Sequence, residues 1–429
     1  MAGEMLATAR APLSRTVILA GTIGNILEWY DFGLYGFFAP VFATVFFPAH
    51  DRIASLIGAY GGFAIGFAMR PIGAMVFGHL GDRKGRRFVL VFSVVMMGCA
   101  TTATALLPTY ASAGIAAPIL LLLLRLFQGF SVGGEFTGSV AYLVETAPPG
   151  RRGQAGSFAN IGSTGGVLLA AAVTAAATTF ATEAELATWA WRLPFLVGGV
   201  IATTGYFLRV HLHETGYEPL PDAHEQPAPL KQAFAEAPGT ILRAVLFTSG
   251  YGIVNYITMV FLPTYASEFA GIAESRALQI NTAAQALALL IVPLSGWLAD
   301  NAFRRRNILI AAFLGELAFA WAAFALTGAH GLAGLWIAQL MFGALLALIM
   351  GTEPAMLSEQ FASRYRLSGY SLSFNIGLGL AGGTSPMIAT ALIGATGSAL
   401  APAWYLMFAA GLAAFAIFLM PDRSRAPLP

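Results

Sequence analysis

Long apolar runs alternate with short polar segments along almost the whole chain. The runs fall at residues 16–47, 53–80, 88–107, 115–145, 154–180 and 193–210, and then at 241–268, 277–299, 307–327, 332–356, 368–394 and 403–420. A helix needs about 20 mostly apolar residues to cross a bilayer, and these runs are of that order or longer. The pattern therefore predicts about twelve membrane-spanning helices and no β-strand.

One polar segment is much longer than the others. Residues 211–240 are rich in Pro and Glu and contain the stretch HETGYEPLPDAHEQPAPLKQ, which is typical of a linker. We therefore expect an N-terminal six-helix bundle at 1–210 and a C-terminal six-helix bundle at 241–429, joined by this cytoplasmic linker.

The composition supports a membrane protein and excludes several other classes. Apolar residues make up 57% of the 429 residues and charged residues only 10%, against about 25% charged residues in a soluble domain. The single cysteine, Cys99, excludes a disulfide scaffold, and a net charge of +2 is too small to indicate nucleic-acid binding. The polar first 15 residues and the long first run argue against a cleavable signal peptide. The lipid bilayer is the expected partner, and the expected state is a monomer.

The positive charges predict the orientation. With both termini inside, 18 of the 23 Lys and Arg residues fall in cytoplasmic segments, 3 fall outside, and Arg70 and Arg125 lie within spans. Because Lys and Arg concentrate in cytoplasmic loops, we expect a multi-pass protein of a bacterial inner membrane with both termini in the cytoplasm.

The two halves of the sequence repeat each other. Three segments recur in the same order at offsets of 218, 218 and 215 residues: 78–82 at 296–300, 133–135 at 351–353, and 160–162 at 375–377. Two parallel bundles related by an axis along the membrane normal are the arrangement of a rocking transporter, which binds its substrate between the halves near the midplane.

Several of these motifs resemble a known family. The segment 78–87 (GHLGDRKGRR) is similar to the loop 2–3 signature of the major facilitator superfamily, and 125–129 (RLFQG) resembles its fourth-helix motif, which is associated with proton coupling. Three further segments resemble the metabolite:H⁺ symporter family: 24–32 (GNILEWYDF), 129–135 (GFSVGGE), and 191–195 (WRLPF) followed by 213–215 (HET).

The resemblance runs from about residue 16 to 420 and implies a function. Members of that family carry proline/betaine, 2-oxoglutarate, citrate and related solutes. It also implies a gate on the cytoplasmic side, formed at the two signature copies by Asp82, Arg83, Arg86 and Asp300, with Arg70 nearby. The second copy departs from the family pattern at Asn301-Ala302-Phe303.

Ionisable groups inside the spans are the main functional candidates, because burying a charge in the membrane is costly. Asn25, Glu28 and Asp31 recur every three to four residues and share one face of the first span. Arg125 reaches a similar depth in the fourth span, so we expect it to pair with one of these carboxylates. Such a pair could serve proton coupling or substrate binding, or it could be purely structural.

Other buried acids have less certain partners. Glu135 lies two helical turns from Arg125, and a pair between Glu135 and Arg70 is expected either to take part in coupling or to brace two helices. Glu353, the repeat mate of Glu135, is expected to meet the inner loops, and Glu316 is expected to be a protonated or snorkelling carboxyl. All six histidines fall in loops or at span ends. The proton carrier must therefore be a carboxylate, and we name Asp31, Glu28 and Glu135 as candidates, with Arg125 as their regulator.

Polar aromatic and amide side chains provide candidates for substrate binding. Tyr251, Asn255 and Tyr256 lie on the seventh span, which faces the first span in the fold that the sequence resembles. They could bind a carboxylate or a quaternary amine, or they could only join helices. The full set of expected binding residues is Arg125, Gln128, Asn25, Trp29, Tyr251, Asn255, Tyr256 and Asn375.

These features together predict an all-α membrane transporter that takes up a small carboxylate-bearing metabolite by proton symport. The substrate could be an organic acid or a zwitterion such as proline or betaine. A proton-independent facilitator or exchanger of organic anions is the alternative. No nucleophile–base set, metal cluster, phosphate-binding loop or soluble signalling domain is visible in the sequence, so we expect no enzyme activity, no metal and no cofactor, and a sensor is disfavoured.

Overall fold

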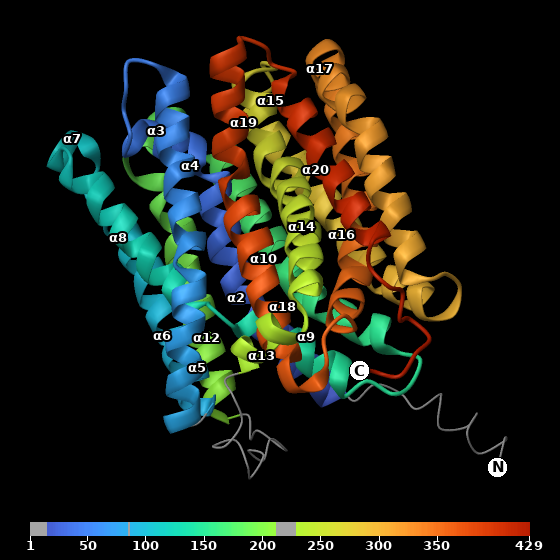
Figure 1. The fold of residues 1–429 in the computed structure, drawn as a ribbon. Helices are drawn as coiled ribbons and strands as arrows, with labels where there is room; N and C mark the ends of the chain where they lie inside the picture. The colour runs from blue at the N-terminus through green and yellow to red at the C-terminus, as the bar shows by residue number, and fades with distance from the viewer. Residues whose placement is uncertain (1–14, 85, 212–228) are drawn as a thin grey trace, which may run out of the picture.

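The fold, obtained as a computed structural model, consists of long helices packed side by side (Figure 1). It describes residues 15–84, 86–211 and 229–429, and within these ranges the side chains at 15–21, 23–24, 78–79, 81–90, 208–211 and 229 lie outside the described part. No strand occurs in these three ranges, which confirms the predicted all-α class.

The N-terminal half contains helices at each of the first six expected spans. They are α2 (Arg15–Phe37) with α3 (Ala39–Val45), α4 (Arg52–Ala68) with α5 (Arg70–Lys84), α6 (Arg86–Ala105), α8 (Ala116–Ser131) with α9 (Glu135–Glu145), α10 (Arg152–Phe180), and α12 (Arg192–His211). Short elements lie between them: α7 (Tyr110–Ala113), α11 (Glu183–Glu185) and the π-helical turn η1 (Leu186–Ala190).

The C-terminal half follows the same plan. Its helices are α14 (Pro238–Tyr256), η2 (Ile257–Phe261) and α15 (Leu262–Glu268); α16 (Glu274–Asn301); α17 (Arg305–Ser358); η3 (Ser363–Tyr365), α18 (Arg366–Phe374), η4 (Asn375–Gly382) and α19 (Gly383–Thr396); and α20 (Ala401–Phe418). A short helix, α13 (Pro229–Glu236), lies within the expected linker.

The long helix α17 contains two of the expected spans. It turns back at Gly331, whose positive φ of 54° is a conformation that glycine adopts without a Cβ clash. Eight of the described helical segments are long and apolar enough to cross a membrane, and the bent pair formed by 183–190 and 192–207 makes a ninth. Since α17 is counted once but holds two spans, these segments account for ten crossings. Helices α2 with α3, and α6, lie at the other two expected spans.

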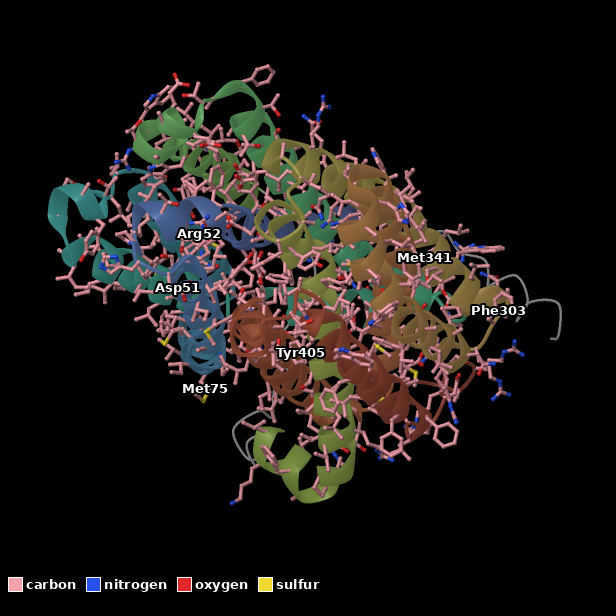
Figure 2. The ribbon with its side chains drawn as sticks, turned by 90° about the horizontal axis from the view of Figure 1, so that it is seen from above. Asp51, Arg52, Met75, Phe303, Met341 and Tyr405 are labelled. Carbon is pink, nitrogen blue, oxygen red and sulfur yellow. The ribbon has the colours of Figure 1, made fainter. Side chains whose placement is uncertain are left out.

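Apolar side chains cover the outside of the bundle. Met75, Phe303 and Met341 are exposed, and Figure 2 shows Met75 and Phe303 at the outer edge of the molecule. An exposed apolar belt of this kind is what a lipid environment requires.

The two halves meet chiefly along three helix pairs. Helix α10 of the N-terminal half packs against α16 and α17 of the C-terminal half, and α4 packs against α19. We call the face that carries α13 and the C-terminus, at the lower edge of Figure 1, the linker face, and the opposite one the far face. Any substrate path between the halves must run between these two faces.

Candidate functional site

The first buried ion pair joins α2 to α8. Arg125 Nη1 donates to Asp31 Oδ2 at 3.0 Å and to Gln128 Oε1 at 2.9 Å. Asp31 Oδ1 also accepts hydrogen bonds from Gln128 Nε2 at 2.7 Å and from Thr101 Oγ1 at 2.6 Å. All four side chains are fully buried. The expected pairing of Arg125 with a carboxylate of the first span is confirmed, and Thr101 is a partner that the sequence did not indicate.

The second buried ion pair joins α2 to α5. Arg70 Nη2 donates to Glu28 Oε1 at 2.6 Å, and its Nε donates to Asn375 Oδ1 of the C-terminal half at 3.2 Å. The sequence predicted an ion pair of Arg70 with Glu135, and the pair that the structure shows is with Glu28. Glu28 is fully buried, whereas Glu135 begins α9 after a break in the helix and is half-buried. The deeper carboxylate gains more from a guanidinium partner.

Asn25 contacts a third set of elements. Its Nδ2 donates to Ser139 Oγ on α9 and to the Ala159 carbonyl on α10. The predicted polar face of the first span therefore exists, but its members face different neighbours. Helix α2 is the element on which the buried polar groups of this half converge.

A small cavity, with a volume of about 20 Å³, lies between the two halves near these pairs. Helices α2, α4 and α10 line it on one side, and α14, η2, α16, α17 and α18 on the other. Of the expected binding residues, Trp29, Tyr251, Asn255 and Tyr256 line this cavity. Ser163 and Thr164 are lining residues that the sequence did not single out.

The other expected binding residues lie outside the lining. Arg125 and Gln128 are engaged with Asp31. The Arg125 guanidinium packs over Phe32, 5.0 Å from the ring centre, and Phe32 itself lines the cavity. Asn25 holds α9 and α10, and Asn375 bonds Arg70 and the Gly133 carbonyl. These four side chains therefore support the lining and do not form it.

Three lining residues have buried hydrogen-bond donors with no partner within the described residues. They are the indole Nε1 of Trp29, the hydroxyl of Tyr256 and the amide Nε2 of Gln285. Buried donors are nearly always satisfied in folded proteins. Three such donors around one cavity are free to bind water or the acceptor groups of a ligand.

Electrostatic contacts close the far face. Arg52 at the start of α4 donates two hydrogen bonds to the Glu268 carboxylate at the end of α15, at 3.0 and 2.6 Å. Tyr60 donates to Thr264 at 2.8 Å one level deeper. Figure 2, viewed from this face, marks Arg52 on the N-terminal half. Each contact links one half to the other.

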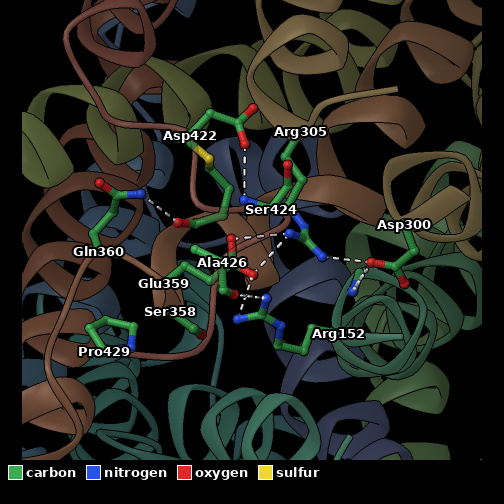
Figure 3. Close-up of polar contacts among 12 residues, drawn as sticks. Arg152, Asp300, Arg305, Ser358, Glu359, Gln360, Asp422, Ser424, Ala426 and Pro429 are labelled. Carbon is green, nitrogen blue, oxygen red and sulfur yellow. Dashed lines mark hydrogen bonds and ion pairs between the residues drawn. The ribbon is translucent and has the colours of Figure 1, made fainter. Parts of the chain in front are cut away.

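A four-residue ion network closes the linker face (Figure 3). Asp300 at the end of α16 accepts hydrogen bonds from the backbone N–H groups of Gly153 and Gln154, both at 2.8 Å, at the start of α10. Arg305 bridges Asp300 at 2.6 Å and Glu359 at 2.9 Å, and Arg152 contacts Glu359 at 3.1 Å. An acid at a helix N-terminus is favoured by the helix dipole, so Asp300 holds the two halves together at this point.

Close backbone contact accompanies this network. A Cβ at Gly296 would lie 2.6 Å from the Gly153 carbonyl oxygen, and one at Gly153 would lie 2.7 Å from the Gly296 carbonyl oxygen. Only glycine allows α10 and α16 to approach this closely. Burial raises the pKa of the Glu359 carboxyl, against the opposing effect of the Arg305 and Arg152 guanidiniums. As the pH falls, Glu359 is therefore protonated at a higher pH than an ordinary glutamate.

The expected gate residues are only partly described. Asp300 lies at the contact between the halves, whereas the side chains of Asp82, Arg83 and Arg86 lie outside the described part. The sequence did not single out Arg152, Arg305 or Glu359, because their charges fitted the cytoplasmic bias and indicated nothing further. The signal in the sequence was an acid at the end of a span next to a basic loop, as at Asp300 and at Glu359.

Two parallel helical halves, a cavity between them, an ion pair at the far face and an ion network at the linker face are the arrangement of a membrane transporter. The profile of the Major Facilitator Superfamily matches residues 21–301. The chain belongs to this superfamily, and it is a transport protein and not an enzyme.

Relatives and solved structures agree with this assignment. The chain is 34% identical over 426 residues to the proline/betaine transporter of Salmonella typhimurium, covering 96% of this chain and 85% of the relative. It is also 34% identical to a putative proline/betaine transporter of Staphylococcus aureus, covering 91% and 84%. The crystal structure of a D-xylose–proton symporter matches with a TM-score of 0.77 at 20% identity, over 96% of this chain and 99% of that one. That last likeness shows the fold alone.

Asp300→Asn is expected to loosen the linker face, because it removes the charge that α10 and Arg305 both contact. Charge-assisted hydrogen bonds contribute about 1.5–3 kcal/mol each, so we expect roughly a tenfold or greater rise in opening at this face. A cysteine placed at Ser163 in a Cys99→Ser background reports opening through its rate of labelling by a thiol reagent added from the linker face.

Asp422→Asn is the matched control, because Asp422 accepts hydrogen bonds from the backbone N–H groups of Arg306 and Ser424, which both belong to its own half. Equal labelling rates in Asp300→Asn and Asp422→Asn would contradict the role given to Asp300.

Proposed function

We propose that this protein takes up a small zwitterion that bears a carboxylate, such as proline or betaine, together with a proton. The observation that carries the proposal is the cavity lining. It combines three unpartnered donors with aromatic rings, and no Asp, Glu, Lys or Arg occurs among the described lining residues. A cavity without net charge suits a solute without net charge.

The unpartnered donors are suited to a carboxylate. The indole N–H of Trp29 is a donor only, and the Tyr256 hydroxyl and the Gln285 amide nitrogen can each donate as well. Three neutral donors can hydrogen-bond the oxygens of a carboxylate, so the cavity needs neither a metal nor an arginine to bind it.

The aromatic rings are suited to the cationic end of the same solute. Trp29, Phe32, Phe63, Tyr256 and Phe374 line the cavity from both halves. A quaternary or secondary ammonium gains about 0.5–2 kcal/mol from each well-placed ring. Since the rings come from both halves, a bound solute would draw the halves together.

Organic di- and tricarboxylates are a poorer match. They need free cations, and the two intramembrane arginines that the sequence offered are already paired, Arg125 with Asp31 and Arg70 with Glu28. The names of the relatives, proline/betaine transporter, agree with the zwitterion.

Asp31 is the proposed proton site, with Arg125 as the group that controls it. Protonation of Asp31 would release Arg125 from its ion pair, and Arg125 packs over Phe32, which lines the cavity. Solute and proton would thus meet at adjacent residues of α2. The Glu28–Arg70 pair, which also reaches Asn375 of the other half, is the second candidate, and Glu135 the third.

The proposed setting follows from the charges. We place the protein in a bacterial inner membrane with the linker face in the cytoplasm, because this orientation puts 18 of the 23 Lys and Arg residues of the sequence in cytoplasmic segments. Uptake then runs from the far face to the linker face, with Asp300, Asp82, Arg83 and Arg86 as the proposed cytoplasmic gate.

Tyr256→Phe is expected to weaken binding of glycine betaine or proline about tenfold or more, since one hydrogen bond to a charged group contributes roughly 1.5–3 kcal/mol. Equilibrium dialysis with labelled solute measures it. Tyr30→Phe is the matched control, because the Tyr30 hydroxyl donates to the Pro194 carbonyl away from the cavity. Citrate as an effective competitor of the labelled zwitterion would contradict the substrate class.

Asp31→Asn is expected to abolish accumulation driven by a pH gradient and to retain exchange of labelled for unlabelled solute. Exchange needs only reorientation of the loaded carrier, whereas accumulation needs net proton movement. Proteoliposomes with and without an imposed gradient measure both activities, with Glu28→Gln as the comparison. If the wild-type protein accumulates solute equally well without a gradient, the proton-independent exchanger is the better account.

A further inference from the structure

We propose that Glu353 is a second protonatable site, in the C-terminal half, that must be neutral for the halves to close on each other. This inference rests on the transport function proposed above and adds a group that the coupling pair on α2 does not include. Glu353 lies on the second limb of α17 and is fully buried.

The surroundings of Glu353 differ from those of the buried acids that have arginine partners. Its Oε1 accepts a hydrogen bond from the Tyr370 hydroxyl on α18 at 2.8 Å, and its Oε2 has no hydrogen-bond partner among the described residues. Asp31, Glu28 and Glu359 each contact a guanidinium, whereas Glu353 forms no ion pair with any of the described residues. A carboxyl satisfied by one phenol is better suited to the protonated form than to a buried charge.

The groups that face Glu353 come from three other helices. Tyr370 is on α18, Tyr251 on α14 lies within electrostatic range, and Asn160 on α10 brings an amide from the opposite half. Tyr251 and Asn160 both line the cavity. Glu353 thus lies next to two residues that line the cavity. A negative charge on its carboxyl would interact electrostatically with a bound solute and with groups of both halves.

The two halves touch on either side of Glu353. The Asn160 amide donates to the Met350 carbonyl at 2.7 Å, one helical turn before Glu353. A Cβ at Gly156 would lie 3.0 Å from the Cβ of Pro354, the residue after it. An ionised Glu353 would need water, and water could reach it only if this contact between α10 and α17 opened.

A row of stacked aromatic rings also links Glu353 to the N-terminal half. Tyr370 stacks on Phe374 at 5.7 Å, and Phe374 stacks on Phe136 of the N-terminal half at 4.8 Å. A change of protonation at Glu353 alters the hydrogen bond of Tyr370, which is the first ring of this row. Protonation of Glu353 would therefore favour the closed contact, and its ionisation the open one.

The test measures solute exchange in proteoliposomes at equal pH on both sides, so that no gradient is needed. The reference is Asp31→Asn, in which the proposed coupling carboxyl on α2 no longer titrates. If Glu353 must be protonated, exchange by the reference falls at alkaline pH, by about tenfold per pH unit beyond the midpoint for a single required proton. Adding Glu353→Gln is expected to remove this fall, because glutamine stays neutral.

Two further variants make the result specific. Glu316→Gln in the same background should keep the alkaline fall, since Glu316 is another buried glutamate of α17 but contacts no tyrosine donor among the described residues. Tyr370→Phe should move the fall to higher pH, because loss of the phenol donor disfavours the ionised carboxylate. This variant remains informative even if Glu353→Gln does not fold.

An unchanged alkaline fall in both Glu353→Gln and Tyr370→Phe would overturn the proposal. So would an equal loss of the fall in Glu316→Gln. Failure of the symport function would be seen separately, as wild-type uptake that does not respond to a pH gradient.

Discussion

The cost of placing charges in the hydrocarbon region organises this structure. Both intramembrane arginines meet that cost by pairing with carboxylates on α2, Arg125 with Asp31 and Arg70 with Glu28. Removing one partner of a buried pair destabilises a protein by roughly 3–5 kcal/mol, because the other charge is left uncompensated. Helix α2 is thereby fixed against α5 and α8. The same pairs offer a way to move protons, because a proton on either carboxylate changes what its arginine can contact.

Contacts between the two halves lie at both ends of the molecule, with the cavity between them. The far face is held by Arg52 and Glu268, and the linker face by Asp300, Arg305, Glu359 and Arg152. Both sets join the two halves, and both are formed in this structure, so the cavity is enclosed between them. Glycine contacts between α10 and α16 leave little room for sliding at the linker face. Two packed halves with contacts at either end are suited to rocking as rigid bodies, in which one set breaks while the other holds.

The architecture could be predicted from the sequence because the bilayer imposes it on length and hydropathy. The internal repeat predicted two parallel halves. The depths of Glu28, Asp31 and Arg125 in their spans predicted a buried ion pair of Arg125 with a carboxylate of the first span, and the structure shows the pair with Asp31. The partner of Arg70 could not be predicted, because it depends on the helix breaks at Met69 and at 132–134, which no apolar pattern marks. Only part of the cavity lining could be predicted. Tyr251 and Tyr256 were identified by residue type, but Ser163 and Thr164 look like ordinary small residues of a packed helix. The position of Glu353 against Tyr370 depends on the crossing of α17 and α18, which is a tertiary feature.

The central claim is that solute binding in the cavity and protonation of Asp31 favour each other, and linkage makes this reciprocal. The direct measurement is proton uptake by the purified protein in weakly buffered solution when glycine betaine is added, followed with a pH indicator. The account predicts that the wild-type protein takes up protons on binding, and that Asp31→Asn binds the solute with most of this uptake lost. Binding without any proton uptake by the wild-type protein, or undiminished uptake by Asp31→Asn, would contradict it.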